Sequence, residues 1–410
     1  MHLAEANPLL KRSGKPICLK KLEVSYTVKR RINYVGWVGN NNLGDEAIYA
    51  ITQDLLSDYE LEVYDSFKHL TLPNTPVFQQ TKDMPSPVSV FGGGTLLPDD
   101  VTWVKPAKYN YVFGTAMKDP SFPSRFDSFD KVIIERLKSF HFRLVGVRDN
   151  FSKNSLDSLG IESEVIGDPV LWLRPSSDLK RDRFKIGINV GCDGLLWGGD
   201  QDRVVQEMIH VCRILKKEGY DLISVPFSEQ DIPYLVTLSE KTGVEIFDEW
   251  SNPQAVVDLI ANCGVFIGER HHSLVVSAAA YTPFVCLEYR PKCSAFAETV
   301  GSLEYCIRTD KVSTENVLER FNHLLDNWLE IRNTLTRRVD QYRKLQLKFV
   351  ERMKDDIESL PESVWQFSLL SERLKNRLFW DSDVVMRKKM GRVWRMYNRL
   401  IFLHLIRFLT

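Results

Sequence analysis

Short apolar runs alternate with amphipathic helical patterns through most of the chain. In the first half, strand-like runs of apolar residues stand at 31–38, 61–64, 88–91, 143–147 and 164–166. In the second half they stand at 185–190, 221–225, 244–247, 264–267 and 283–287. Helical patterns lie between many of these runs, for example at 204–217, 253–262 and 274–280. Repeated alternation of this kind predicts parallel sheets covered by helices on both faces, and therefore an α/β protein.

A polar stretch divides this pattern into two halves. Residues 174–183 contain the turn-forming run Pro175-Ser176-Ser177, and we interpret the stretch as a hinge. We expect an N-terminal Rossmann-like domain over 31–175 and a C-terminal one over 183–310, with an irregular arm at 1–30.

The remaining residues follow two different patterns. Between 311 and 356, apolar positions at heptad-like spacing predict a long helix or helices that pack back across both domains. A coiled coil with a partner is the alternative. In the tail at 357–410, a helical face carrying Trp394 and Tyr397 is flanked by lysines and arginines. Residues 384–409 are typical of a helix lying in a membrane interface, and a terminal helix docked on protein is the equal alternative.

Composition narrows the class of protein. The chain has 410 residues, 44% of them hydrophobic, and a formal net charge of zero, so nothing global indicates nucleic acid as a partner. The 7 cysteines are scattered without a CxxC pair, which favours a reducing compartment over a disulfide framework. No stretch reaches the ~18 apolar residues of a spanning helix. We expect a cytoplasmic protein, with a peripheral position at the inner membrane face as the alternative.

Cationic side chains follow two neighbouring strands of the second half. Arg270 and His272 come directly after the run that ends at Ile267, and Lys292 follows the next strand. In an open α/β sheet, ligands bind outside the carboxyl ends of the strands. The three side chains are therefore expected to converge on one small anionic substrate.

The first half contains two glycine-containing loops after strands. Residues 42–47 read Asn-Leu-Gly-Asp-Glu-Ala and open a helix, where free N–H groups favour an anion. Asp45 and Glu46 at this point also complement the helix dipole without any ligand. The spacing is not that of a dinucleotide-binding loop. Gly92 to Gly94 form either a ligand-contacting loop or a tight turn.

Two further positions stand where a strand gives way to a turn. Arg148 ends a strand, and its two interpretations are a ligand contact at the sheet edge and a local pair with Asp149. Asp168, before Pro169, is interpreted mainly as a turn-forming residue.

Together these segments resemble the polysaccharide pyruvyltransferase family. The Gly-x-Arg-x-His motif of that family appears as Gly268 to His272, and its Tyr-x-x-Lys element as Tyr289 to Lys292. Its Asn-x-Gly-Asp-Glu-Ala signature appears at 42–47, and the triple glycine and the Arg148 segment match as well. His271 stands where the family usually has an apolar residue, so the motif position belongs to His272. The resemblance covers about residues 32–308.

The resemblance implies two Rossmann-like domains facing a cleft, the arrangement called GT-B. It also implies transfer of pyruvate from phosphoenolpyruvate to a sugar diol of a polysaccharide or its lipid-linked precursor. The products are a cyclic ketal and phosphate, within exopolysaccharide or cell-envelope biosynthesis. The N-terminal domain is then the acceptor side, where Asn42, Gly44, Gly93 and Gly94 contact substrate, and the C-terminal domain is the donor side.

Within that implied reaction, the residue types suggest roles. Arg148, Arg270 and Lys292 are assigned to the phosphate and carboxylate of the donor, because a small molecule with two anionic groups needs several cations. His272 is assigned as general acid, and Asp45 or Glu46 as acceptor of the hydroxyl proton. No cluster has metal-ligand spacing and no Walker-type loop is present, so neither a metal nor a nucleotide cofactor is expected.

Two other functions fit the same fold class. A GT-B glycosyltransferase using a nucleotide sugar would need a paired-Glu nucleotide motif in the C-terminal domain, which the sequence lacks. A non-catalytic sugar-binding relative is the third interpretation, and the intact set of cations argues against it.

Overall fold

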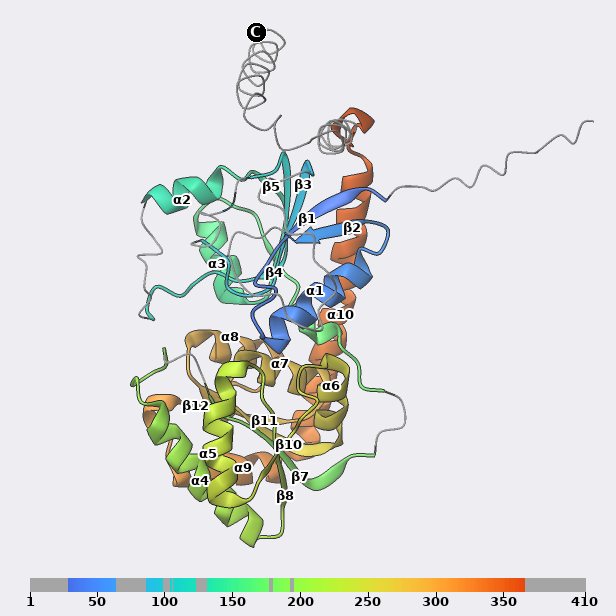
Figure 1. The fold of residues 1–410 in the computed structure, drawn as a ribbon. Coiled ribbons are helices and arrows are strands. Elements are labelled where there is room, and N and C mark those ends of the chain that lie inside the picture. Colours follow the sequence, from blue (N-terminus) through green and yellow to red (C-terminus); the bar gives the residue numbers. More distant parts are fainter. Residues whose placement is uncertain are drawn as a thin grey trace, which may run out of the picture.

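Two parallel sheets of six strands each, one above the other, form the body of the protein in the computed structural model (Figure 1). The structure describes residues 29–63, 86–98, 104, 106–122, 131–176, 180–191 and 195–365. Nearly all of the predicted arm at 1–30, and the predicted interfacial segment at 384–409, lie outside these residues.

The N-terminal sheet has the strand order β2-β1-β3-β4-β5-β6. Its strands are β1 (Arg31–Val35), β2 (Glu60–Val63), β3 (Val88–Gly92), β4 (Tyr109–Thr115), β5 (Phe142–Val147) and β6 (Glu164–Val165). The helices of this half are α1 (Leu43–Leu55), α2 (Lys131–Lys138), α3 (Asn150–Ser158) and the short η2 (Pro169–Trp172). The pattern predicted every strand of this half except β4.

The missed strand, β4, lies in the middle of the sheet between β3 and β5. Its sequence includes a buried asparagine, which obscures the apolar pattern. Asn110 donates from Nδ2 to the carbonyl oxygens of Ala107 (2.9 Å) and Phe140 (2.7 Å) and accepts the hydroxyl of Ser89 (2.7 Å). A polar side chain satisfied in this way is tolerated inside a sheet, although the sequence does not reveal its partners.

The C-terminal sheet has the order β12-β11-β10-β7-β8-β9. Its strands are β7 (Asp182–Asn189), β8 (Asp221–Ser224), β9 (Glu245–Ile246), β10 (Cys263–Gly268), β11 (Phe284–Glu288) and β12 (Cys306–Arg308). The helices are α4 (Gln201–Lys217), α5 (Ile232–Thr242), α6 (Pro253–Asn262), α7 (His271–Ala279) and α8 (Pro291–Val300), with short turns η3 (Glu229–Asp231), η4 (Leu303–Tyr305) and η5 (Thr309–Lys311). The sequence pattern missed the three-residue strand β12 at the edge of this sheet. The expected α/β fold with two parallel sheets is confirmed.

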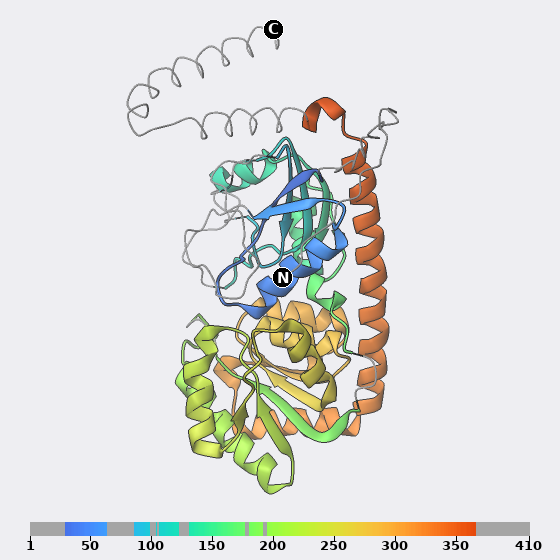
Figure 2. The same ribbon diagram turned by 45° about the vertical axis from the view of Figure 1, so that its right-hand side comes forward.

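Two helices follow the second sheet, α9 (Thr314–Asp326) and α10 (Trp328–Glu358). The apolar stripe read from the sequence is interrupted between them at Asn327, which ends α9. The 31-residue α10 runs along the side of both domains (Figure 2). Leu335 and Val339 belong to the core of the C-terminal half, whereas Phe349 and Met353 belong to that of the N-terminal half. One helix therefore joins both cores.

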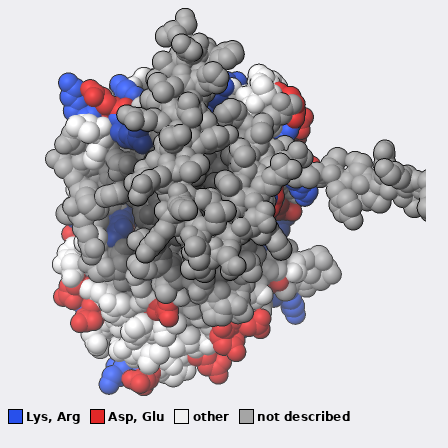
Figure 3. Space-filling view, turned by 45° about the horizontal axis from the view of Figure 1, so that its top comes forward, with Lys and Arg blue, Asp and Glu red and all other residues white. Residues whose placement is uncertain are grey.

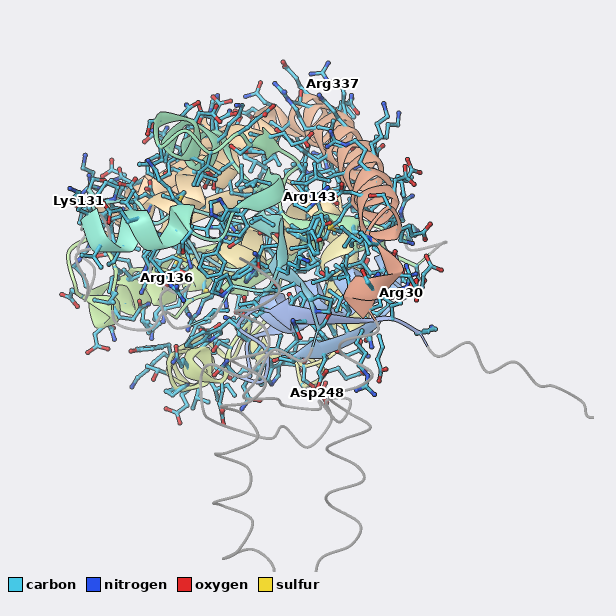
Figure 4. The ribbon with its side chains drawn as sticks, turned by 90° about the horizontal axis from the view of Figure 1, so that it is seen from above. Arg30, Lys131, Arg136, Arg143, Asp248 and Arg337 are labelled. Atoms are coloured by element: carbon cyan, nitrogen blue, oxygen red, sulfur yellow. The ribbon has the colours of Figure 1, made fainter. Side chains whose placement is uncertain are left out.

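Ion pairs hold the end of this helical segment on the N-terminal sheet. Arg143 donates to both carboxylate oxygens of Asp356 at 2.5 and 2.6 Å, and Arg30 contacts Glu362 at 2.6 Å. Both arginines are labelled in the view from above (Figure 4). Because these pairs are partly exposed, each contributes only about 0–1 kcal/mol, and the apolar contacts dominate.

Charged side chains of both signs are interspersed on the coloured part of the face in Figure 3. This mixture agrees with the net charge of zero.

Among the helices that the structure describes, none combines the length and apolarity needed to cross a bilayer.

Candidate active site

The carboxyl ends of the strands in both halves border one cavity of about 230 Å³ between the two domains. Its lining from the N-terminal half comprises Trp37, Asn42, Asp45, Gly94, Thr95, Leu96, Lys118 and Arg148. Its lining from the C-terminal half comprises Phe227, Arg270, His271, His272, Tyr289, Arg290 and Lys292. Two larger surface pockets, of about 620 and 730 Å³, contain none of the predicted site residues.

Most of the predicted residues therefore meet in one place. Asn42, Asp45, Gly94, Arg148, Arg270, His272 and Lys292 all line this cavity, whereas Gly44, Glu46 and Gly93 do not. The seven come from segments that are far apart in the chain, at the ends of strands β3 and β5 and at the starts of helices α1, α7 and α8.

The first turn of α1 supplies the N-terminal wall. Asn42 caps this helix and accepts the N–H of Gly44 at 3.1 Å. Asp45 is buried, and burial raises its pKa to about 7, although Lys292 and Arg148 act to lower it. Glu46 instead accepts the backbone N–H of Gly39 at 2.7 Å and supports the preceding loop. Of the two predicted carboxylates, only Asp45 faces the cavity.

The glycines near this wall act in different ways. A Cβ atom on Gly44 would lie 1.9 Å from Cγ and Nδ1 of His272, so only glycine allows this contact. Gly93 has φ +76°, and a Cβ there would meet Ile48 Cδ1 at 2.8 Å. Gly94, with φ +64°, lines the cavity. Gly44 and Gly93 therefore shape the site by close packing, not by forming its lining.

Arg148 lies at the end of β5 and is 3% exposed. Its guanidinium is 3.2 Å from Thr95 Oγ1, 3.4 Å from Asp149 Oδ2 and 4.0 Å from Asp168 Oδ2. Asp149 also caps α3 by accepting the N–H of Ser152 at 2.7 Å. Both interpretations of Arg148 apply, because it pairs locally and also lines the cavity.

Arg270 and Lys292 occupy the start of two helices after neighbouring strands. Arg270 precedes α7, and its Nε donates to Asp231 Oδ1 at 2.7 Å. Lys292 is the second residue of α8, and its Nζ lies 5.1 Å from the centre of the Tyr289 ring. The convergence of cations expected from strand order is therefore present in the structure.

Two buried histidines form the first turn of α7. Their ring centres are 5.2 Å apart, and His271 Nε2 lies 3.3 Å from Asp168 Oδ2. His272 Nε2 has no hydrogen-bond partner among the residues that the structure describes. Burial lowers the pKa of both imidazoles well below the usual range, and nearby Lys292 and Arg148 add to this lowering. Desolvation therefore favours the neutral form of both rings at pH 7.

Some residues of the site were not found from the sequence. Asp168 accepts the N–H of Val170 at 3.0 Å, as its predicted role in the turn requires, but its second oxygen also reaches His271. Lys118 and Arg290 line the cavity as two more cations. Arg290 follows the predicted strand β11 closely, and this position is the signal that would have indicated it. Lys118 follows β4, which the sequence pattern missed, so no such signal was present for it.

One group in the described part of the chain has the composition of a metal site. Asp168, His271 and His272 each offer a ligand atom within 4.8 Å of the others. The guanidinium of Arg148 lies 4.0 Å from the same carboxylate oxygen of Asp168 that contacts His271. This fixed positive charge, together with that of Lys292, opposes binding of a divalent cation.

The two domains also contact each other beside the cavity. Leu43 N donates to Phe227 O at 3.0 Å, and Asn41 Nδ2 donates to Glu229 Oε2 at 2.7 Å. An antiparallel bridge between Asn42 and Ser228 completes the contact. The loop that leads into α1 is therefore docked on the loop between β8 and α5.

Sequence comparison identifies relatives of this chain. The family described as polysaccharide pyruvyl transferase matches residues 42–291. The amylovoran biosynthesis protein AmsJ of Erwinia amylovora is 29% identical over 100 residues. That match spans 24% of this chain and 24% of the relative.

Solved structures with low sequence identity share the fold. A UDP-glucosyltransferase from Polygonum tinctorium is 12% identical with a TM-score of 0.52, over 82% of this chain and 100% of its own. A protein described as a UDP-N-acetylglucosamine 2-epimerase from Listeria monocytogenes is 11% identical with a TM-score of 0.54, over 82% of this chain and 98% of its own. The fold is that of GT-B proteins, with two Rossmann-like domains; at this level of identity the likeness concerns fold alone.

Proposed function

We propose a donor for this chain, which belongs to the polysaccharide pyruvyl transferase family and is a polysaccharide-modifying transferase. The proposed donor is phosphoenolpyruvate. In this proposal it transfers the pyruvate carbons to two hydroxyls of a saccharide or lipid-linked saccharide. The products are a cyclic ketal and phosphate, and the reaction takes place in the cytoplasm.

The observation that carries this proposal is the charge of the cavity. Arg148, Arg270 and Lys292 line a space that also contains His272 and Asp45. Phosphoenolpyruvate has a phosphate and a carboxylate attached to the same carbon, and guanidinium groups suit both because they donate two parallel hydrogen bonds. Fixed cations also stabilise negative charge on the departing phosphate.

The reaction requires two proton movements. A proton added to the methylene carbon turns it into the methyl group and leaves an oxocarbenium-like centre at the neighbouring carbon. One sugar hydroxyl attacks that centre, phosphate leaves, and the second hydroxyl closes the ring. Two hydroxyl protons are lost, one balancing the new methyl hydrogen and one leaving with phosphate. The site therefore needs a proton donor and a proton acceptor in reach of the same carbon.

His272 and Asp45 are the proposed pair, with His272 as donor and Asp45 as acceptor. They come from different domains, and the ring of His272 packs on Gly44, the neighbour of Asp45. Burial holds the pKa of His272 well below its usual range, so the ring must take up a proton when the donor binds. Negative charge from phosphoenolpyruvate favours this, because an anion close to an imidazole raises the pKa of the ring.

The opposite assignment is favoured by one observation. Asp45 has a pKa raised to about 7 by burial, so it retains a proton in much of the free enzyme at neutral pH. In that alternative Asp45 protonates the methylene carbon and His272 accepts the hydroxyl proton. Exchange of deuterium from ²H₂O into the methylene group of recovered phosphoenolpyruvate separates the two. Loss of the proton donor abolishes this exchange, whereas loss of the acceptor preserves it.

The proposed function is tested by following phosphate release from phosphoenolpyruvate with candidate lipid-linked or nitrophenyl glycosides as acceptors. A ketal methyl signal in the product, with no release when the acceptor is omitted, is the expected result. The same assay is run with a chelator and is expected to be unaffected. Release of nucleotide from a nucleotide sugar, with a strict need for a divalent ion, would instead support a GT-B glycosyltransferase.

A further inference from the structure

A fully buried carboxylate lies directly behind Arg270. Asp231, at the end of η3, has no exposed surface. One of its oxygens accepts Arg270 Nε at 2.7 Å, and the other accepts Phe227 N and Asn189 Nδ2, each at 3.0 Å. Burial alone raises the pKa of this carboxyl, and the adjacent guanidinium is the largest influence acting to lower it.

Asn189 completes a frame around the arginine. This residue ends β7, next to Gly268 of β10. Its Oδ1 accepts the main-chain N–H of Arg270 at 2.9 Å, while its Nδ2 donates to Asp231. The backbone of Arg270 is thus hydrogen-bonded to Asn189 and its side chain to Asp231, and these two buried residues are hydrogen-bonded to each other.

We propose that Asp231 is a positioning residue that holds the guanidinium of Arg270 in the orientation that binds the donor. The inference rests on the proposed function, in which Arg270 contacts phosphoenolpyruvate. Arg148 and Lys292 line the same cavity, so the mutual repulsion of three cations opposes their convergence. A buried carboxylate on the far side of Arg270 counteracts that repulsion and fixes the plane of the guanidinium group.

The segment that contains Asp231 also receives the other domain. Phe227 and Glu229, four and two residues before Asp231, form the hydrogen bonds to the loop at 41–43. Docking of the N-terminal domain and orientation of Arg270 therefore depend on the same five residues of chain. A shift of this loop moves both, and a displacement of about 1 Å is enough to reduce turnover by about a hundredfold.

The test is a double-mutant cycle on phosphoenolpyruvate affinity, measured by titration calorimetry with the full chain. Asp231→Asn is expected to weaken binding by about tenfold or more in the natural background, and by less than about twofold in an Arg270→Gln background. Equal factors in both backgrounds would overturn the proposal, because a carboxylate of merely structural importance acts independently of Arg270. Asp221→Asn, at the opposite end of β8, is the matched control and is expected to have no effect.

A second variant keeps the proposal testable if the Asp231→Asn protein does not fold. Asp231→Glu retains the charge but moves the carboxylate by one methylene, so a positioning role predicts loss of affinity with a normal circular dichroism spectrum. Unchanged affinity in a folded Asp231→Glu protein would contradict the proposal.

An independent measurement separates this inference from the proposed function. The ¹⁵N-labelled Nε–Hε signal of Arg270, assigned by its absence in Arg270→Lys, is expected to exchange slowly with solvent in the natural protein and fast in Asp231→Asn. If the natural protein does not bind phosphoenolpyruvate, the proposed function fails, and this signal still decides whether Asp231 holds Arg270. A signal unaltered in Asp231→Asn would overturn the positioning role.

Discussion

The imidazole ring of His272 packs directly on the main chain of Gly44, and the two residues come from different domains. A Cβ atom at Gly44 would lie 1.9 Å from both Cγ and Nδ1 of the ring. The first turn of α1 and the first turn of α7 thus meet through this imidazole ring. This contact places Asp45 and His272 on the same cavity.

A methyl group at Gly44 is expected to force these two turns apart. Gly44→Ala should reduce turnover by about a hundredfold, since a displacement of about 1 Å at a catalytic group has that effect. The melting temperature should fall as well, because the ring is buried and has little room to move. Initial rates and thermal unfolding measure the two effects. In a His272→Ala background the ring is gone, and Gly44→Ala should then leave the melting temperature nearly unchanged; an equal loss in both backgrounds would refute the clash.

Binding of phosphoenolpyruvate is expected to take up a proton at His272. Burial holds the imidazole neutral in the free site, and the anionic donor raises its pKa. Affinity should therefore fall as pH rises, with about one proton taken up per donor bound. Calorimetry in buffers of different ionisation enthalpy measures this number. His272→Gln should lose the uptake and most of the turnover while His271→Gln keeps both; the reverse result would assign the role to His271.

Asp45 is expected to lower the stability of the folded protein at neutral pH. Burial raises the pKa of its carboxyl from 3.8 to about 7. Between pH 3.8 and pH 7, the unfolded chain therefore releases a proton that the folded chain keeps. The contribution of this group to the free energy of unfolding is full below pH 3.8. It falls by up to a few kcal/mol as pH rises towards 7. Asp45→Asn should remove that loss, raising the melting temperature at pH 8 much more than at pH 5. Equal melting temperatures at pH 8 would show that the carboxyl is not desolvated.

Loss of cations from the cavity is expected to weaken donor binding. Lys292→Gln should raise the dissociation constant of phosphoenolpyruvate roughly tenfold or more, because a charge-assisted contact is lost. Arg148 and Arg270 pair with buried acids, so lysine is the gentler replacement there and tests loss of the planar donor fork. Lys217→Gln, exposed at the end of α4, is the control. Unchanged affinity in all three site variants would refute the assignment.

The basic tail is expected to bind anionic membranes. Its lysines and arginines attract the lipid headgroups, and Trp394 and Tyr397 suit the interface. The full chain should co-sediment with vesicles rich in anionic lipid at low salt and be released at high salt, whereas a chain ending at Leu370 should remain in solution. Equal, negligible binding by both proteins would leave docking on protein as the role of the tail.

Much of the fold was readable from local patterns. Period and length of the apolar runs predicted most of the strands on both sides of the hinge, because a strand buried on both faces needs little beyond apolar residues. The pattern missed β4 and the short strand β12. Of these two, β4 shows the limit of this reasoning. The polar group of Asn110 is satisfied by partners at Ser89, Ala107 and Phe140, and no local pattern reveals such partners.

For the candidate site, local sequence patterns were enough to find the residues at the carboxyl ends of strands. Arg148, Arg270 and Lys292 were found in this way, because parallel strands all end at one edge of a sheet. Three other properties of the site follow from the folded structure alone: Asp45 and not Glu46 faces the cavity, Asp168 reaches His271, and burial lowers the pKa of both imidazoles. These properties depend on burial and on neighbours from another domain, since a pKa is set by desolvation and nearby charge in three dimensions, neither of which is encoded in spacing along the chain.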